Sequence, residues 1–180
     1  YTPGEGIGAV VLKPLAAAIA DGDCIRGVIR GSAVGHGGKT NGYTVPDPVR
    51  QAEVVSAALA RAGLTAADIG YVEAHGTGTE LGDPIEVAGL NRALAAAPPG
   101  TVRVGSVKSN VGHLESAAGG AGLTKVLLQF RHAELAPSLH LETVNPHLAL
   151  AGGPLRLQTA LTPWDRTVRS DGTTVPRRAG

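Results

Sequence analysis

The feature that most constrains the fold of this chain is residues 71–86, where a strand, a polar loop and a helix follow one another. Tyr71 and Val72 favour a strand. Asp83 and Pro84 predict the start of a helix, because an aspartate side chain caps free backbone N–H groups and proline suits the first helical position. Ligands of α/β proteins collect at the carboxyl ends of such strands. The run therefore predicts an α/β fold with a functional loop.

The loop inside this run has the residue types of a binding site. His75 stands at the end of the strand, and the hydroxyls of Thr77 and Thr79 can donate and accept hydrogen bonds. Three glycines allow a ligand to come close to the backbone: Gly76, Gly78 and Gly82. A histidine at a strand end is more often structural than catalytic, so this loop alone does not define an activity.

A second run, residues 102–123, has the same order of strand, polar loop and helix. Residues 102–107 favour a strand, residues 108–113 predict a polar loop, and residues 114–123 predict a helix whose small side chains permit close packing. His113 ends the second loop. Two histidines in two strand-to-helix loops predict a site with two imidazole groups.

Both runs resemble motifs of the β-ketoacyl synthase family, which has the thiolase-like fold. Residues 73–79 (Glu-Ala-His-Gly-Thr-Gly-Thr) and 108–113 (Lys-Ser-Asn-Val-Gly-His) are similar to its two histidine motifs. Residues 37–48 further resemble ketosynthases of modular polyketide synthases, particularly those served by a separate acyltransferase. The resemblance covers nearly the whole chain. It implies a layered αβαβα fold of the α/β class, of which residues 1–180 form the C-terminal portion.

The resemblance implies a decarboxylative Claisen condensation in polyketide chain elongation. A cysteine thiolate holds an acyl chain, and a malonyl unit on an acyl carrier protein loses carbon dioxide and attacks the thioester. By resemblance, His75 and His113 are catalytic residues that donate hydrogen bonds to the malonyl thioester oxygen, where negative charge develops. Lys108 resembles the family's lysine that sets the charge balance of the site.

Three further residues have two interpretations each. Glu115 resembles the family's carboxylate near the site, but it could equally cap the following helix. Thr77 and Thr79 resemble threonines that contact the phosphopantetheine arm, and they could instead satisfy the loop backbone. The phosphopantetheine arm would be carried by the acyl carrier protein, so no directly bound cofactor is expected. The remaining histidines are expected at the surface or in packing: His36, His132, His140 and His147.

The family's nucleophilic cysteine is not expected in this chain. Residues 8–12 and 24–31 favour buried strands and resemble the part of a ketosynthase that follows the nucleophile. Cys24, the single cysteine, follows an acidic turn without a constrained elbow, so we interpret it as a packing residue in a strand. We expect the nucleophile elbow upstream, the closing glycine-rich loop downstream, and no activity from the isolated chain.

The composition argues against several classes of binding partner. A formal net charge of +1 and 3% aromatic residues give no basis for nucleic-acid binding, and no apolar run is long enough to span a membrane. A metal site is not expected, because no close helical pair such as His-x-x-x-His occurs. One cysteine is compatible with a reducing, cytoplasmic location. The resemblance implies a homodimer that works with an acyl carrier protein, other synthase domains and a separate acyltransferase.

The sequence leaves three alternatives open. The chain could belong to a non-condensing homologue that translocates or decarboxylates, to a split ketosynthase with its other half on a separate polypeptide, or to a scaffold without activity. The presence of His75 favours the condensing form over the first. Elsewhere, apolar spacing predicts helices over residues 14–20, 49–62 and 123–130, with Gly63 ending the second, and residues 155–159 favour a short strand.

Overall fold

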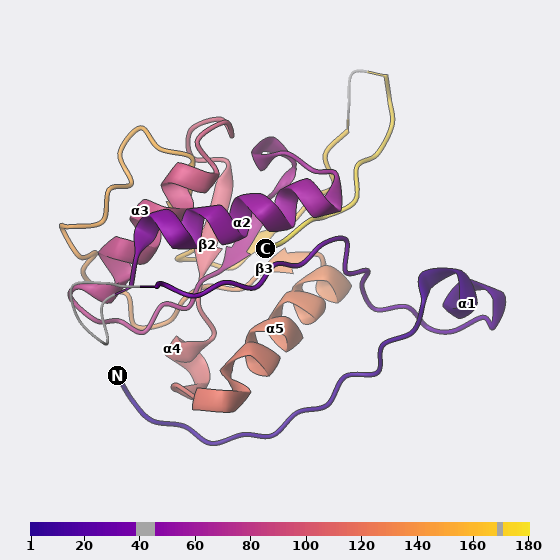
Figure 1. Ribbon diagram of the computed structural model, residues 1–180, viewed down its shortest axis with the longest axis horizontal. Coiled ribbons are helices and arrows are strands. Elements are labelled where there is room, and N and C mark those ends of the chain that lie inside the picture. The colour runs from indigo at the N-terminus through magenta and orange to yellow at the C-terminus, as the bar shows by residue number, and fades with distance from the viewer. Residues whose placement is uncertain (39–45, 169–170) are drawn as a thin grey trace.

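The computed structural model describes residues 1–38, 46–168 and 171–180. Its helices are α1 (Leu15–Ala20), α2 (Pro48–Ala62), α3 (Gly82–Ala93), α4 (Lys108–Val111) and α5 (Ala118–His132), with 3₁₀ turns η1 (Ala66–Asp68) and η2 (Glu115–Ala117). Its strands are β1 (Tyr71–Glu73), β2 (Val102–Gly105), β3 (Glu134–Leu135), β4 (Leu155–Leu157) and β5 (Thr162–Pro163). Figure 1 shows α2 and α3 together on one side and α5 apart from them.

A parallel sheet in the order β1-β2-β4 forms the centre of the described structure. Val72 pairs with Val104, and Val104 pairs with Leu157, so the two loops that follow β1 and β2 leave the same edge of the sheet. Residues 178–180 run along the free side of β1, where the Gly180 N–H donates to the Tyr71 carbonyl. The two short strands β3 and β5 pair antiparallel in a separate sheet. The expected α/β arrangement is confirmed.

The side chains of the sheet alternate between two hydrophobic clusters, as the pleat of a strand requires. Val72 and Val104 face α2 and α3, where they pack with Val87 and Leu90 of α3 and with Leu94 directly after it. On the other face, Tyr71 packs with Val126 of α5 and with the ring of Trp164. Two α-helical layers thus enclose the sheet, consistent with part of a layered α/β fold.

The helix expected over residues 49–62 is confirmed as α2. Asp47 precedes it, and its carboxylate accepts hydrogen bonds from the N–H groups of Val49 and Arg50. Gly63 ends it in the left-handed conformation, with φ of 65°. The helix expected over residues 14–20 is present as α1, and the apolar run over residues 123–130 lies within α5.

The N-terminal segment differs from its prediction. Residues 8–12 and 24–31 form no strand, and Ile7 and Val11 are fully exposed. A parallel strand is stable only beside a neighbour that completes its hydrogen bonds, and within the described ranges no neighbour pairs with these residues. Cys24 is exposed in this segment, so its interpretation as a packing residue in a strand is wrong for this structure.

Two further predictions are modified. Residues 108–111, expected as loop, form the single helical turn α4. The segment 37–48, which carries part of the family resemblance, falls largely on residues 39–45, outside the described residues. Among the helices of the described ranges, none has the length and apolar character needed to cross a membrane.

Candidate functional site

The loop that carries His75 is held by two carboxylates from the first turns of α3. Glu86 accepts hydrogen bonds from the backbone N–H groups of His75 (2.6 Å) and Gly76 (2.9 Å). Asp83 accepts one from the N–H of Gly78 at 3.1 Å. These acidic residues therefore bind the loop, which fixes the backbone of His75 against the helix.

The start of α3 corrects one expectation. Asp83 was expected to cap the helix, but α3 already begins at Gly82, because the N–H of Asp83 donates to the Thr79 carbonyl. The Thr79 hydroxyl accepts a hydrogen bond from the Gly82 N–H at 3.1 Å, in the manner of a capping side chain. The carboxylate of Asp83 is thereby free to reach back to the loop.

His113 is oriented by its own loop and by the N-terminal residues. Its backbone N–H donates to the Thr2 carbonyl, and its carbonyl accepts from the Gly4 N–H, both at 2.9 Å. Its side-chain Nδ1 accepts a hydrogen bond from the N–H of Glu115 at 2.9 Å. An accepting Nδ1 carries no proton, so the neutral ring has its proton on Nε2, which is left as a donor.

The two histidine rings meet edge to face. Their centroids lie 5.3 Å apart and their planes are inclined by 84°. Partial burial lowers the pKa of His75, and the positive charge of Lys108 lowers it further, with a smaller contribution from His113; Glu86 and Asp83 act in the opposite direction. His75 is therefore mainly neutral at neutral pH. The structure places His113 and Lys108 close enough to His75 for their charges to affect its pKa.

The other site residues expected from the sequence lie around this pair. Thr77 and Thr79 are in the same loop, with their hydroxyl oxygens 3.3 Å apart. Glu115 stands in the first turn of η2, has a φ of 50°, and accepts a hydrogen bond from the Tyr1 hydroxyl at 2.8 Å. No side-chain cap bond is found at η2 or α5, so the carboxylate of Glu115 does not act as their N-cap.

The remaining histidines are all exposed: His36, His132, His140 and His147. Within the described ranges, no three histidine, cysteine or acidic side chains gather closely enough to hold a metal ion. Cys24 follows α1 in the chain and is exposed.

Sequence reasoning missed the polar groups that lie behind the two loops. Glu73, Lys125 and Tyr71 form a buried cluster in which Lys125 Nζ lies 2.9 Å from a Glu73 carboxylate oxygen. A signal was present in the sequence, since Lys125 is the only charged residue in the apolar run of residues 117–130. A buried lysine almost always has a partner, and that expectation points to an acidic residue on the facing strand.

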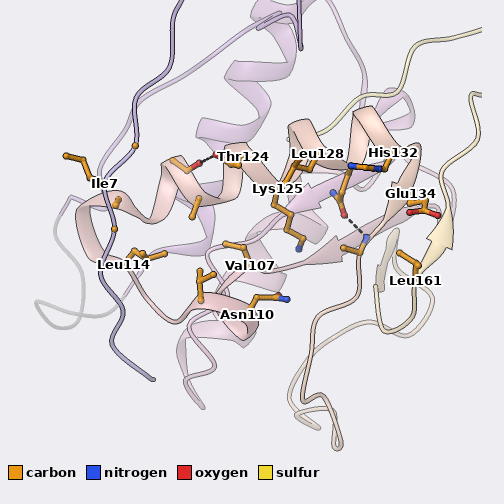
Figure 2. A pocket seen from close by; sticks show the side chains of 18 residues that line it. Ile7, Val107, Asn110, Leu114, Thr124, Lys125, Leu128, His132, Glu134 and Leu161 are labelled. Atoms are coloured by element: carbon orange, nitrogen blue, oxygen red, sulfur yellow. Dashed lines mark hydrogen bonds between the residues drawn. The ribbon is translucent and has the colours of Figure 1, made fainter.

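A cavity of about 460 Å³ lies over α5 beside the site. Figure 2 shows Ile7 and Leu114 toward one end of the cavity, Val107 and Asn110 near its middle and Leu161 toward the other end. Lys125 projects from α5 toward the sheet. The lining is mainly apolar, and neither His75 nor His113 belongs to it.

The fold and the two loops place this chain in the β-ketoacyl synthase family. The family described as "Beta-ketoacyl synthase, C-terminal domain" matches residues 26–142, and this chain belongs to that family. The matched segment includes β1, β2 and both histidine loops.

Individual polyketide synthases and solved ketosynthase structures support this family assignment. The chain is 61% identical to polyketide synthase ThaG of Burkholderia thailandensis over 92% of its own length, but it spans only 3% of that protein. It is 54% identical to polyketide synthase PksM of Bacillus subtilis, of which it spans 4%. Among solved structures, it resembles the oxazolomycin ketosynthase domain OzmH KS7 of Streptomyces albus, with a TM-score of 0.88 and 54% identity, covering 93% of this chain and 30% of that one. The module 6 ketosynthase of the bacillaene synthase of Bacillus subtilis gives a TM-score of 0.85 and 42% identity, covering 93% and 29%.

Proposed function

We propose that this chain provides the C-terminal portion of a ketosynthase that condenses an acyl thioester with a carrier-bound malonyl unit. The observation that carries the proposal is the edge-to-face pair of His75 and His113 in the segments that follow two neighbouring parallel strands. Membership of the β-ketoacyl synthase family and the similarity to polyketide synthases support the same reaction.

The reaction places specific demands on the two imidazoles. When the malonyl C–CO₂ bond breaks, carbon dioxide leaves and the electron pair moves toward the thioester oxygen as an enolate. The enolate carbon then forms a bond with the acyl carbonyl carbon, and the cysteine thiolate leaves. Hydrogen-bond donors at the enolate oxygen stabilise this charge. His113 has a free Nε2–H, and a neutral His75 ring still carries one N–H group. Both rings can therefore donate a hydrogen bond to the enolate oxygen.

Lys108 and the two threonines would have supporting roles. The positive charge of Lys108 helps to keep His75 neutral and would favour the approach of the malonyl carboxylate. The hydroxyls of Thr77 and Thr79 lie on the same loop and would contact the phosphopantetheine arm of an acyl carrier protein. The backbone N–H of Glu115 donates a hydrogen bond to His113 Nδ1. The carboxylate of Glu115 would contribute to the charge balance beside His113.

The same proposal assigns the nucleophile to another part of a complete ketosynthase. The exposed apolar residues of the N-terminal segment, among them Ile7, Val11 and Val34, support a neighbouring protein surface that covers them. The chain also spans only 30% of a solved ketosynthase domain that it resembles. The complete enzyme would work as a homodimer with an acyl carrier protein, other synthase domains and a separate acyltransferase.

The test uses a complete ketosynthase that contains residues 1–180. His75→Ala and His113→Ala should leave acylation of the cysteine intact and lower the condensation rate by about 10²–10³, the usual effect of removing one oxyanion donor. The exposed His147→Ala is the control and should condense at the unmodified rate. Normal condensation in both site variants would overturn the proposal. Decarboxylation without carbon–carbon bond formation by the unmodified enzyme would instead identify a non-condensing homologue.

A further inference from the structure

We propose that Glu73 is a positioning residue that joins the His75 loop to the Lys108 turn, a role that rests on the function proposed above. Glu73 is the last residue of β1, two residues before His75. One carboxylate oxygen accepts a hydrogen bond from the N–H of Val107 at 2.5 Å. Val107 directly precedes Lys108, the first residue of α4. A single side chain thus connects the ends of both strands that carry the site.

The second oxygen of Glu73 anchors this connection to α5. It accepts a hydrogen bond from the Tyr71 hydroxyl at 2.6 Å and lies 2.9 Å from Lys125 Nζ. Lys125 also donates to the Tyr71 oxygen at 2.7 Å. Each side-chain oxygen of the cluster therefore accepts a hydrogen bond, and the Tyr71 hydroxyl also donates one to the carboxylate. Burial raises the pKa of Tyr71, and the charge of Glu73 raises it further, which keeps this hydroxyl protonated.

The cluster is enclosed. The side chains of Lys125 and Glu73 are only 9% and 11% exposed. In such surroundings a carboxylate with matched partners holds its position strongly, whereas one without them is expensive to bury. The Glu73 side chain therefore has one arrangement that satisfies Val107, Tyr71 and Lys125 together.

Two glycines leave the room that this arrangement needs. A Cβ at Gly105 would lie 2.8 Å from the Tyr71 hydroxyl oxygen and 3.3 Å from Lys125 Nζ. A Cβ at Gly122 would lie 3.1 Å from Cγ of Glu73. Gly105 ends β2, and Gly122 is in the small-residue start of α5. β2 thus approaches the Tyr71 hydroxyl and Lys125, and α5 approaches the Glu73 side chain, more closely than a larger residue would allow.

The positioning role and a merely stabilising ion pair predict different results for a pair of variants. Glu73→Gln keeps an oxygen for Val107 but turns an amide donor toward Lys125, so the side chain must move. In the double variant Glu73→Gln with Lys125→Met, the amide can donate to the Tyr71 oxygen while its own oxygen accepts from Val107. The double variant should therefore recover the link without any charge.

The first measurement follows the His75 imidazole and the Val107 amide by NMR across pH in the 180-residue chain. For Glu73→Gln we expect a displaced Val107 amide signal and a rise in the pKa of His75 as Lys108 moves away, with both values returning in the double variant. Gly122→Ala is a second variant that keeps the charges and favours the helix, and it should displace the Val107 signal as well. Unchanged values in Glu73→Gln and Gly122→Ala, or no recovery in the double variant, would overturn the proposal.

The second measurement separates this proposal from the function itself. In the complete ketosynthase, Glu73→Gln should lower kcat for condensation about tenfold or more, with KM for the malonyl carrier nearly unchanged and kcat recovered in the double variant. Asp68→Asn is the matched control, because Asp68 pairs with Arg178 at the other end of β1, and it should leave kcat unchanged. If His75 responds in the NMR experiment while the unmodified enzyme does not condense, Glu73 keeps its positioning role and the proposed reaction is wrong.

Discussion

The protonation state of His75 follows from its neighbours. Partial burial and the cation of Lys108 both disfavour the imidazolium, and they outweigh the opposing charges of Glu86 and Asp83. A neutral imidazole can donate from one nitrogen while the other accepts, which suits a group that stabilises a developing oxyanion. The same balance has two measurable consequences.

Lys108→Met should raise the pKa of His75 toward its ordinary value of 6.5, because one of the two main causes of the lowered pKa is removed. An NMR titration of the imidazole in the 180-residue chain measures this shift. Lys13→Met is the control, since Lys13 pairs with Asp21 and Asp23 beside α1 and not with the site. A pKa that stays the same or falls in Lys108→Met would contradict the electrostatic account.

The stability of the chain should depend on pH through the same group. His75 has a lower pKa in the folded chain than the 6.5 expected when it is unfolded, so between these values the unfolded chain binds more protons. The free energy of unfolding should therefore fall as pH decreases through that window, and the loss is complete below the folded pKa. Denaturant unfolding at a series of pH values measures it. His75→Gln should flatten this part of the profile, whereas His147→Gln should not.

At the scale of elements, the first turns of α3 hold the loop that carries His75. Glu86→Gln replaces a carboxylate that accepts two N–H groups by an amide with one acceptor, so we expect a loss of about 1–3 kcal/mol in the free energy of unfolding. The pKa of His75 should fall further, because the charge of Glu86 raises it. Glu80→Gln is the control on the same loop, where the side chain is exposed. An unchanged free energy of unfolding in Glu86→Gln would show that the loop keeps its conformation without these two hydrogen bonds.

The turn between α4 and η2 depends on Gly112, whose φ of 76° and ψ of −174° belong to a region that residues with a Cβ rarely enter. A Cβ there would also lie 2.8 Å from the Thr2 carbonyl oxygen. Gly112→Ala should cost about 1–3 kcal/mol in unfolding free energy and displace His113. Gly119→Ala in α5 has open space and should stabilise the chain or leave it unchanged, so urea unfolding of the two variants gives a matched comparison.

Local patterns predicted those elements whose signals lie within their own residues. Gly63 and the apolar spacing before it predicted α2, and the strand formers at residues 71–72 predicted β1. The link of Glu73 to Val107 and Lys125 joins residues far apart in the sequence, so no local pattern revealed it. The resemblance to a family identified His75 and His113 as a pair, and the structure supplied the tautomer and the surroundings that the pattern did not contain.

At the scale of the whole molecule, the described N-terminal segment and the rest of the chain differ in how much they bury. The sheet and its helices enclose two hydrophobic clusters, whereas residues 8–12 and 24–31 carry strand-forming side chains that are exposed. The strand prediction for these residues was physically reasonable, because their composition suits a sheet with both faces covered. What the described residues lack is a neighbouring strand with which they could pair.

This difference leads to a prediction about the complete ketosynthase. In the 180-residue chain, amides of residues 7–12 and 24–31 should exchange with solvent rapidly, because within the described ranges they have no strand partner. In a complete ketosynthase the same amides should be protected by about 10²-fold or more, since an opening free energy of 1.4 kcal/mol already slows exchange tenfold and buried strands require several times that. Hydrogen exchange with mass spectrometry compares the two samples, with the β1 and β2 peptides as an internal reference that is protected in both. Equal, rapid exchange of residues 7–12 in the complete enzyme would show that the segment is not a strand there, and the surfaces of Ile7 and Val11 would then need another occupant.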